Sequence, residues 1–279
     1  MSICLTLLKR MPVTALIGLL LTFGFLVMAL FAPWLAPYPM SESVGDMWMG
    51  PSAEFWLGTD NLGRDLLSRL IHGARTTMTI AALATALAFS IGSVLGILAA
   101  VYGGWVDQLI SRGVDIVMSI PTLIFALVIL SVMPSTVLML IVIMGVLDST
   151  RVFRISRAVA VNINVMDFVE AARLRGEGKS WIIFREILPN ALTPLVAELG
   201  LRFIFAVLFL SSLSFLGLGV QPPEADWGSM VRENRQGIVF GVPAALIPAA
   251  AIALLAISVN LVADWVLRHT TDLKGGRRG

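Results

Sequence analysis

The chain has 279 residues, of which 57% are hydrophobic and 14% are charged, and its mean hydropathy is +0.89. Soluble domains carry about 25% charged residues, and a soluble core of this length could not bury so much apolar surface, so a soluble enzyme is excluded. A disordered chain, which needs low hydrophobicity and high net charge, is excluded as well, and the net charge of +2 does not indicate nucleic-acid binding.

Apolar runs that could cross a bilayer occur along the whole chain. A helix needs about 20 apolar residues to cross ~30 Å of hydrocarbon. Six runs of roughly this length lie at residues 11–34, 76–102, 115–133, 135–150, 191–218 and 242–267. The first follows Lys9 and Arg10 as in a signal peptide, but it is too long for one and no clear cleavage site follows, so we expect a retained anchor. Only Pro134 and its neighbours separate the third and fourth runs, which predicts a helical hairpin.

Lysine and arginine predict the orientation of these spans, because cytoplasmic loops carry an excess of both. With the N-terminus inside, the inside segments hold 14 basic residues and the outside segments hold 5. We therefore expect both termini in the cytoplasm. The sequence predicts an all-α polytopic membrane protein with six transmembrane helices. It divides into an anchor helix with an outside loop (1–75) and a five-helix core (76–279) that contains an inside loop at 151–190.

The first outside loop contains the charged residues Asp60, Arg64 and Asp65. They are candidates for holding a substrate. The alternative is that they cap and pair a short amphipathic helix at 61–72, whose leucines pack against the membrane domain.

A G-x-x-x-G pair, Gly92 and Gly96, lies in the second run. Small residues at this spacing let two membrane helices approach closely. We therefore expect helix packing here rather than ligand binding.

The inside loop predicts two short helices on the cytoplasmic face. Residues 166–175 favour a helix with Asp167 as its N-cap, and Gly176 and Gly178 allow a turn. An amphipathic segment follows, and Pro189 with Asn190 marks the entry to the fifth run. We expect a rigid knob suited to a groove on a soluble partner. Residues 178–180 resemble the end of a phosphate-binding loop, but position 173 is arginine and a helix precedes it, so nucleotide binding is not expected.

Two ionisable residues, Glu198 and Arg202, lie four residues apart in the fifth run and share one helix face. Ionisable groups at this depth usually face an interior or a water-filled path. They are therefore candidates for lining a translocation route, and a structural ion pair is the equal alternative.

Enzymatic and metal-dependent functions find little support in the sequence. One cysteine and two distant histidines provide no metal site of recognisable spacing. An intramembrane enzyme would need catalytic polar residues clustered within the spans, whereas Asp115, Asp148 and Asp264 lie near span ends. A self-contained secondary transporter often shows an internal repeat, and none is evident.

Three stretches resemble one family. Glu170-Ala171-Ala172, Gly176 and the run at 187–190 resemble the EAA loop of permease subunits of bacterial ABC importers. Residues 57–60 and 63–70 resemble the first outside loop of the dipeptide, oligopeptide and nickel permeases, and residues 214–223 with Trp227-Gly228 resemble the end of their fifth span. Their order and spacing fit the C-type subunit, over nearly the whole chain.

The resemblance implies a type I ABC importer permease fold in the bacterial inner membrane, and a chain that is not an enzyme. It implies a homologous B-type permease subunit, two cytoplasmic ABC ATPases that bind ATP and Mg, and a periplasmic substrate-binding protein as partners. No cofactor is expected in this chain. The resemblance also implies alternating access, in which ATP is expected to close the ATPase dimer, bring the two knobs together and open the pathway outward. The commonest substrates are dipeptides and oligopeptides, with nickel, glutathione and opine-like solutes as alternatives.

The resemblance also implies roles for individual residues. The expected binding-protein contacts are Asp60, Arg64, Asp65 and Trp227, and the expected pathway residues are Glu198 and Arg202. The residues expected to couple the chain to the ATPases are Glu170, Ala171, Ala172, Gly176, Trp181, Phe184, Arg185, Leu188 and Pro189.

Overall fold

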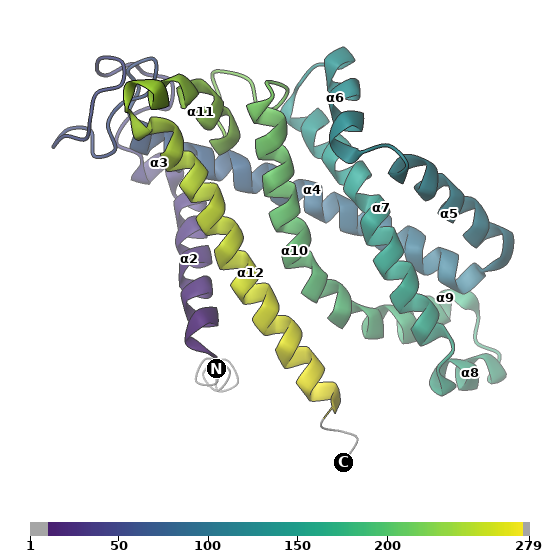
Figure 1. Cartoon of the computed structure of the whole chain (residues 1–279). Coiled ribbons are helices and arrows are strands. Elements are labelled where there is room, and N and C mark those ends of the chain that lie inside the picture. Colours follow the sequence, from purple (N-terminus) through teal and green to yellow (C-terminus); the bar gives the residue numbers. More distant parts are fainter. Residues whose placement is uncertain (1–10, 276–279) are drawn as a thin grey trace.

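The computed structural model describes residues 11–275 of the chain (Figure 1). These residues form helices, turns and two isolated bridges, in agreement with the predicted all-α class. The elements in chain order are α2 (Val13–Leu30), α3 (Ala32–Leu35), α4 (Leu66–Tyr102), α5 (Gly104–Met118), α6 (Thr122–Val132), α7 (Val137–Asn164), α8 (Asp167–Leu174), α9 (Lys179–Trp181), η1 (Ile182–Ile187), α10 (Leu188–Phe215), α11 (Trp227–Asn234), η2 (Arg235–Phe240), η3 (Pro243–Ala245) and α12 (Leu246–Gly275).

Four described helices are long and apolar enough to cross a membrane, and a bent helix pair could supply a fifth span. The four are α2, α4, the continuous helix from α9 to α10, and the segment from η3 into α12. The structure thus confirms a helical protein with several candidate spans, and it does not confirm the predicted number of six.

The third predicted span is not one straight helix. It begins earlier than expected, as α5, and breaks at residues 119–121 before α6, with a bend of 79°. Pro121 explains the break, because proline lacks a backbone N–H and disfavours helical geometry at the preceding residue. The hairpin with the next span is present, since α6 ends just before Pro134 and α7 begins just after it.

The fourth predicted span, 135–150, is much too short. It continues as α7 to Asn164, so Arg151, Arg154 and Arg157 lie on a helix and not in a loop. Two of these arginines reach α5: Arg154 pairs with Asp115 at 2.8 Å, and Arg157 pairs with Asp107. Two of the three arginines therefore have a carboxylate partner on a neighbouring helix.

The prediction of a separate short helix at 61–72 is also wrong. A helix begins at Leu66, with the Asp65 carboxylate accepting from Ser68 N, and it continues without a break into the second span as α4. Its 37 residues correspond to about 55 Å, more than the thickness of a bilayer core. The predicted domain boundary at residue 75 falls inside this helix.

The G-x-x-x-G pair packs α4 against α7, as predicted. A Cβ on Gly92 would lie 2.6 Å from Ser149 O, and one on Gly96 would lie 2.8 Å from Phe153 O. Only glycine permits this approach of the two backbones.

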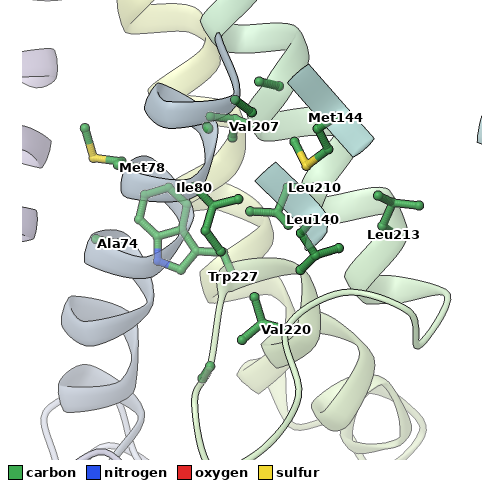
Figure 2. Packing of buried hydrophobic residues seen from close by; sticks show 14 of the residues in the cluster. Ala74, Met78, Ile80, Leu140, Met144, Val207, Leu210, Leu213, Val220 and Trp227 are labelled. Atoms are coloured by element: carbon green, nitrogen blue, oxygen red, sulfur yellow. The ribbon is translucent and has the colours of Figure 1, made fainter. Parts of the chain in front are cut away.

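The main core lies where α4, α7, α10 and α11 meet. Trp227 is fully buried there and packs close to Ala74, Met78 and Ile80 of α4 (Figure 2). Its indole N–H donates to Leu70 O at 2.9 Å, so the core joins α11 to the first turns of α4.

The two ends of the bundle differ. The first turn of α2, the last turns of α12 and the short helix α8 lie at one end, and α3 and α11 lie at the other (Figure 1). Some of the basic residues counted for the orientation, Lys9, Arg10, Arg277 and Arg278, lie outside the described residues.

Candidate functional site

The inside loop forms the predicted pair of helical segments joined at a glycine. Gly176 has a φ of +87°, a left-handed conformation that glycine adopts without strain. Its N–H donates to Arg173 O at 2.9 Å, and Glu177 N donates to Ala172 O at 3.2 Å, which closes the end of α8. A Cβ at this position would meet nothing within 4 Å. The requirement for glycine is therefore one of backbone conformation and not of space.

The start of α8 differs from the prediction. Met166 occupies the N-cap without a side-chain hydrogen bond, and Asp167 is the first helical residue. Asp167 and Glu170 both lie in the first turn, where negative charge interacts favourably with the helix dipole.

A second hydrophobic cluster fixes these segments to the bundle. Val169 and Ala172 of α8 and Ile182 and Ile187 of η1 are buried. Val169, Ile182 and Ile187 pack with residues of α4, α7 and α10, which are Ile97, Val101, Ala160, Ile163, Ala191 and Leu195. The knob, formed by α8, α9 and η1, therefore packs against three long helices, α4, α7 and α10.

The outer surface of the knob combines apolar and basic side chains. Of the predicted coupling residues, Ala172 is buried and Trp181 and Leu188 are half-buried; the exposed ones are Glu170, Ala171, Gly176, Phe184, Arg185 and Pro189. Leu174, which the sequence reasoning missed, is 84% exposed, and Phe184 is 66% exposed. Leu174 lies on the otherwise polar face of the predicted helix, and this exposed position could have identified it as a contact residue from the sequence.

Aromatic side chains hold the basic residues at the edge of the knob. The Arg175 guanidinium lies 5.8 Å from the Trp181 ring centroid, and Lys179 Nζ lies 4.4 Å from that of Tyr102. These cation–π contacts place fixed positive charge around the exposed apolar residues.

Pro189 and Asn190 lie at the start of α10, as predicted, but they do not interrupt the helical backbone. The π-helical turn η1 runs directly into α10, with Pro189 in the first turn of the latter, where a missing N–H costs little. The Asn190 side-chain amide donates to Glu186 O at 2.7 Å. The knob and the fifth span therefore form one continuous helical element.

The charged residues of the first outside loop form a buried network. Asp60 pairs with Arg64 at 2.7 Å and also with Arg69, and both arginines pair with Glu233 of α11 at 2.8 and 2.7 Å. Asp60, Arg64 and Asp65 are buried. The structure therefore has the alternative arrangement, in which they cap and pair α4, and none of the three is offered to a partner at the surface.

Trp227 is likewise buried, and its neighbour Asp226 caps α11. The Asp226 carboxylate accepts from Gly228 N at 3.0 Å and Ser229 N at 3.3 Å. Burial raises the pKa of Asp226, and hydrogen bonds from Ser229, Ser214 and the Gly228 amide oppose that rise. Other apolar residues at this end are exposed, among them Met47, Trp56, Leu62, Val239 and Phe240.

Glu198 and Arg202 meet on α10, as their spacing predicted, and a third residue joins them. Arg202 Nη2 lies 2.7 Å from Glu198 Oε1, and Nη1 lies 3.6 Å from Asp148 Oδ1 of α7. The Arg202 guanidinium also lies 5.0 Å from the Phe205 ring centroid. The arginine is therefore shared between two carboxylates on two helices.

A cavity of about 660 Å³ lies beside this cluster, between α4, α5, α6, α7 and α10. Its lining is largely apolar and includes Leu123, Met144, Leu147, Phe205 and Phe209, together with Ile120 and Pro121 at the break between α5 and α6. The charged residues in the lining are Asp148 and Arg151; among the described residues, it includes neither Glu198 nor Arg202. Sequence reasoning missed this pair because it placed Arg151 in a loop.

Among residues 11–267, whose side chains the structure describes, no group of three His, Cys, Asp or Glu side chains could hold a metal ion. The structure thus has the knob at one end, the Glu198–Arg202–Asp148 cluster with its cavity between the long helices, and the buried ion-pair network of the first loop at the other end.

Comparison with known proteins gives consistent matches. Residues 92–272 match the family model of the binding-protein-dependent transport system inner membrane component, and residues 13–50 match that of the N-terminal TM domain of oligopeptide transport permease C. The chain is 37% identical over 267 residues to a di/tripeptide transport system permease protein of Pseudomonas aeruginosa, covering 93% of this chain and 88% of the relative. It is 34% identical over 261 residues to a dipeptide transport system permease protein of Alkalihalophilus pseudofirmus (93% and 86%). It is also 34% identical over 268 residues to a glutathione transport system permease protein of Escherichia coli (95% and 87%).

Proposed function

The chain belongs to the family of binding-protein-dependent transport system inner membrane components, and from this membership we infer that it forms half of the translocation pathway of an ATP-driven peptide importer. Members of this family are permease components and not enzymes. The observation that carries the inference is the knob of α8, α9 and η1. It lies inside the matched segment and is continuous with the fifth span.

We propose six crossings and the type I importer fold, with α5 and α6 as one bent span and α7 as another. The 28 residues of α7 would extend about 42 Å. Its charged residues pair with α5 and α10, through Arg157 with Asp107 and Asp148 with Arg202. Charges paired within a bundle are compatible with a membrane helix.

The proposed orientation places α8 and both termini in the cytoplasm. Its support is the excess of basic residues near that end of the bundle. In a Cys4→Ala background, Ser43→Cys should react with an impermeant thiol reagent in cells whose outer membrane has been permeabilised, and Ser180→Cys should not. Both positions are exposed. Labelling of Ser180→Cys in cells with a closed inner membrane would show that the proposed orientation is wrong.

The knob is proposed to engage one of two cytoplasmic ATPases, which bind ATP and Mg. Exposed Leu174 and Phe184 provide an apolar centre, with Glu170 and Arg185 as polar contacts around it. This combination of a desolvated centre and a polar rim is typical of protein interfaces. A homologous B-type permease would present a second knob to the second ATPase.

A periplasmic binding protein is proposed to deliver substrate to the opposite end. Because Asp60, Arg64, Asp65 and Trp227 are buried, their proposed role is to hold the docking surface in shape. The exposed residues of that end, Met47, Trp56, Leu62, Val239 and Phe240, would form the contact itself.

The substrate is proposed to be a dipeptide or short oligopeptide. Two of the relatives compared above carry di- or tripeptide names, and glutathione is the second candidate because one relative is named for its transport. Nickel and opine-like solutes are the other substrates that the family resemblance allows, and no relative compared above carries either name.

Uptake in a strain that lacks this chain tests the function. The wild-type chain should restore energy-dependent uptake of radiolabelled dialanine, and Gly176→Val should not, although it reaches the membrane. If the wild-type chain restores uptake of glutathione but not of dialanine, glutathione is the substrate. Dialanine and glutathione uptake that are both independent of the chain would overturn the peptide assignment.

A further inference from the structure

The cavity beside α7 contains an unusual pair of charges for an apolar membrane-embedded space. Asp148 and Arg151 lie three residues apart on α7 and both line it, next to Phe205 and Met144. Asp148 is 11 residues from the start of α7, or about 16 Å along the helix. Ionisable groups at such a depth mark a functional site unless a partner accounts for them.

The structure leaves both charges with unused bonding capacity. Arg202 makes its closer contact with Glu198, at 2.7 Å, and reaches Asp148 only at 3.6 Å. A carboxylate can accept about four hydrogen bonds, so Asp148 can still accept from a ligand. Within the described part of the chain, Arg151 has a cation–π contact with Phe205 at 5.9 Å and no ion pair within 4.0 Å.

The dimensions and charge of this site favour a small zwitterion. Residues three apart on a helix are neighbours, with Cβ atoms ~5–6 Å apart, and a two-residue peptide spans at most ~7 Å. A free ammonium group could therefore contact Asp148 while the carboxylate contacts Arg151. A volume of about 660 Å³ lies within the ~300–1,000 Å³ of small-molecule sites. Its apolar walls can accommodate side chains of different kinds.

The surrounding cluster is electrically balanced. Asp148 and Glu198 carry two negative charges, and Arg151 and Arg202 carry two positive charges. A solute with one charge of each sign keeps this balance, whereas a bare divalent cation would leave two positive charges uncompensated in a medium of low dielectric constant.

We propose that this cavity is a transient binding site on the translocation pathway for short peptides with free termini, in which Asp148 receives the ammonium group and Arg151 the carboxylate. The proposal rests on the proposed function, and it names the residues of this chain that contact the substrate during transport. Apolar walls with two opposed charges explain how one site can pass many side chains and still recognise the peptide backbone ends.

Photo-crosslinking of the purified four-subunit complex tests the site without any variant. The probe is a dipeptide of alanine and benzoylphenylalanine with free termini, compared with its N-acetylated and C-amidated forms. The free dipeptide should crosslink to cavity residues such as Met144 and Phe205, and each blocked form should do so about tenfold less, the loss expected for one charge-assisted hydrogen bond. Equal crosslinking of all three forms, or crosslinks that map only elsewhere in the complex, would overturn the proposal.

Variants then assign the two ends. Asp148→Asn should abolish the preference for a free N-terminus and leave the preference for a free C-terminus, and Arg151→Gln should do the reverse. Arg154→Gln is the matched control, because Arg154 lies one turn further along α7, is exposed and pairs with Asp115 outside the cavity. Dialanine uptake is measured in parallel. Normal wild-type uptake with both preferences unchanged in the two variants would refute this site alone, and absent wild-type uptake would refute the proposed function.

Discussion

Alanine at Gly176 is the sharpest test of the knob. The residue has a φ of +87°, and a Cβ there would meet nothing within 4 Å. Alanine therefore adds no clash, and its whole effect is the cost of a left-handed residue, about 1–2 kcal/mol. That cost lowers the population of the native turn, and hence the apparent affinity of the ATPase for the complex, by up to about 30-fold. Asparagine tolerates this backbone region better, so Gly176→Asn should lose less.

Gly178 provides the matched control for this experiment. It lies in the same loop with a φ of −73°, and a Cβ there is also unobstructed. Gly178 is the N-cap of α9, where alanine caps less well than glycine, so Gly178→Ala should lose some ATPase recovery but less than Gly176→Ala. The measurements are the amount of each variant in the membrane, the ATPase recovered with it, and dialanine uptake. Equal ATPase recovery with Gly176→Ala and Gly178→Ala would refute the reasoning.

Three further predictions concern packing, capping and charge. Gly92→Leu should strongly reduce the amount of folded protein, because a Cβ at that position would lie 2.6 Å from the backbone of α7. Gly24→Leu is the control and should not, since a Cβ there would meet nothing within 4 Å. Protease resistance of the two purified variants measures both effects. Asp226→Ala removes the cap of α11 and should destabilise the protein by about 1–2 kcal/mol. Asp226→Asn should retain most of the capping stability. Equal melting temperatures of the two variants would exclude a capping role. Arg202→Ala leaves two carboxylates, those of Glu198 and Asp148, without their shared arginine, at a cost of about 3–5 kcal/mol. It should therefore reduce the amount of assembled complex more than Glu198→Ala, and the double variant should partly restore that amount. Equal assembly of all three variants would show that the shared arginine is not structural.

Several features could be predicted because they depend on local sequence. The turn at Gly176 and the close packing at Gly92 follow from residue type at a given spacing, and both are present. The i, i+4 pairing of Glu198 with Arg202 follows from helix geometry alone, and it is present as well.

The remaining features depend on contacts between distant residues. Hydropathy measures the transfer of a segment into lipid and not where its helix ends, so the continuation of α7 past residue 150 could not be predicted from it. Arg64 and Glu233 are separated by 169 positions and pair at 2.8 Å, and no local pattern indicates such a partner. The break before α6 had a visible signal in Pro121, but that signal lay within an otherwise uninterrupted apolar run.

The course of α10 shows how one helix can connect the two ends of the molecule. It continues from the π-helical turn of the knob, passes Arg202 at mid-length and contributes Phe205 and Phe209 to the cavity wall. At its far end it is fixed to α11, since a Cβ on Gly228 would lie 2.5 Å from Ser211 O. Pro194 lies between the knob and Arg202 and leaves the carbonyl of the residue four positions earlier without its helical donor. Bending should therefore concentrate there, so that a displacement of the knob changes the tilt of the segment that lines the cavity while the contact with α11 is retained.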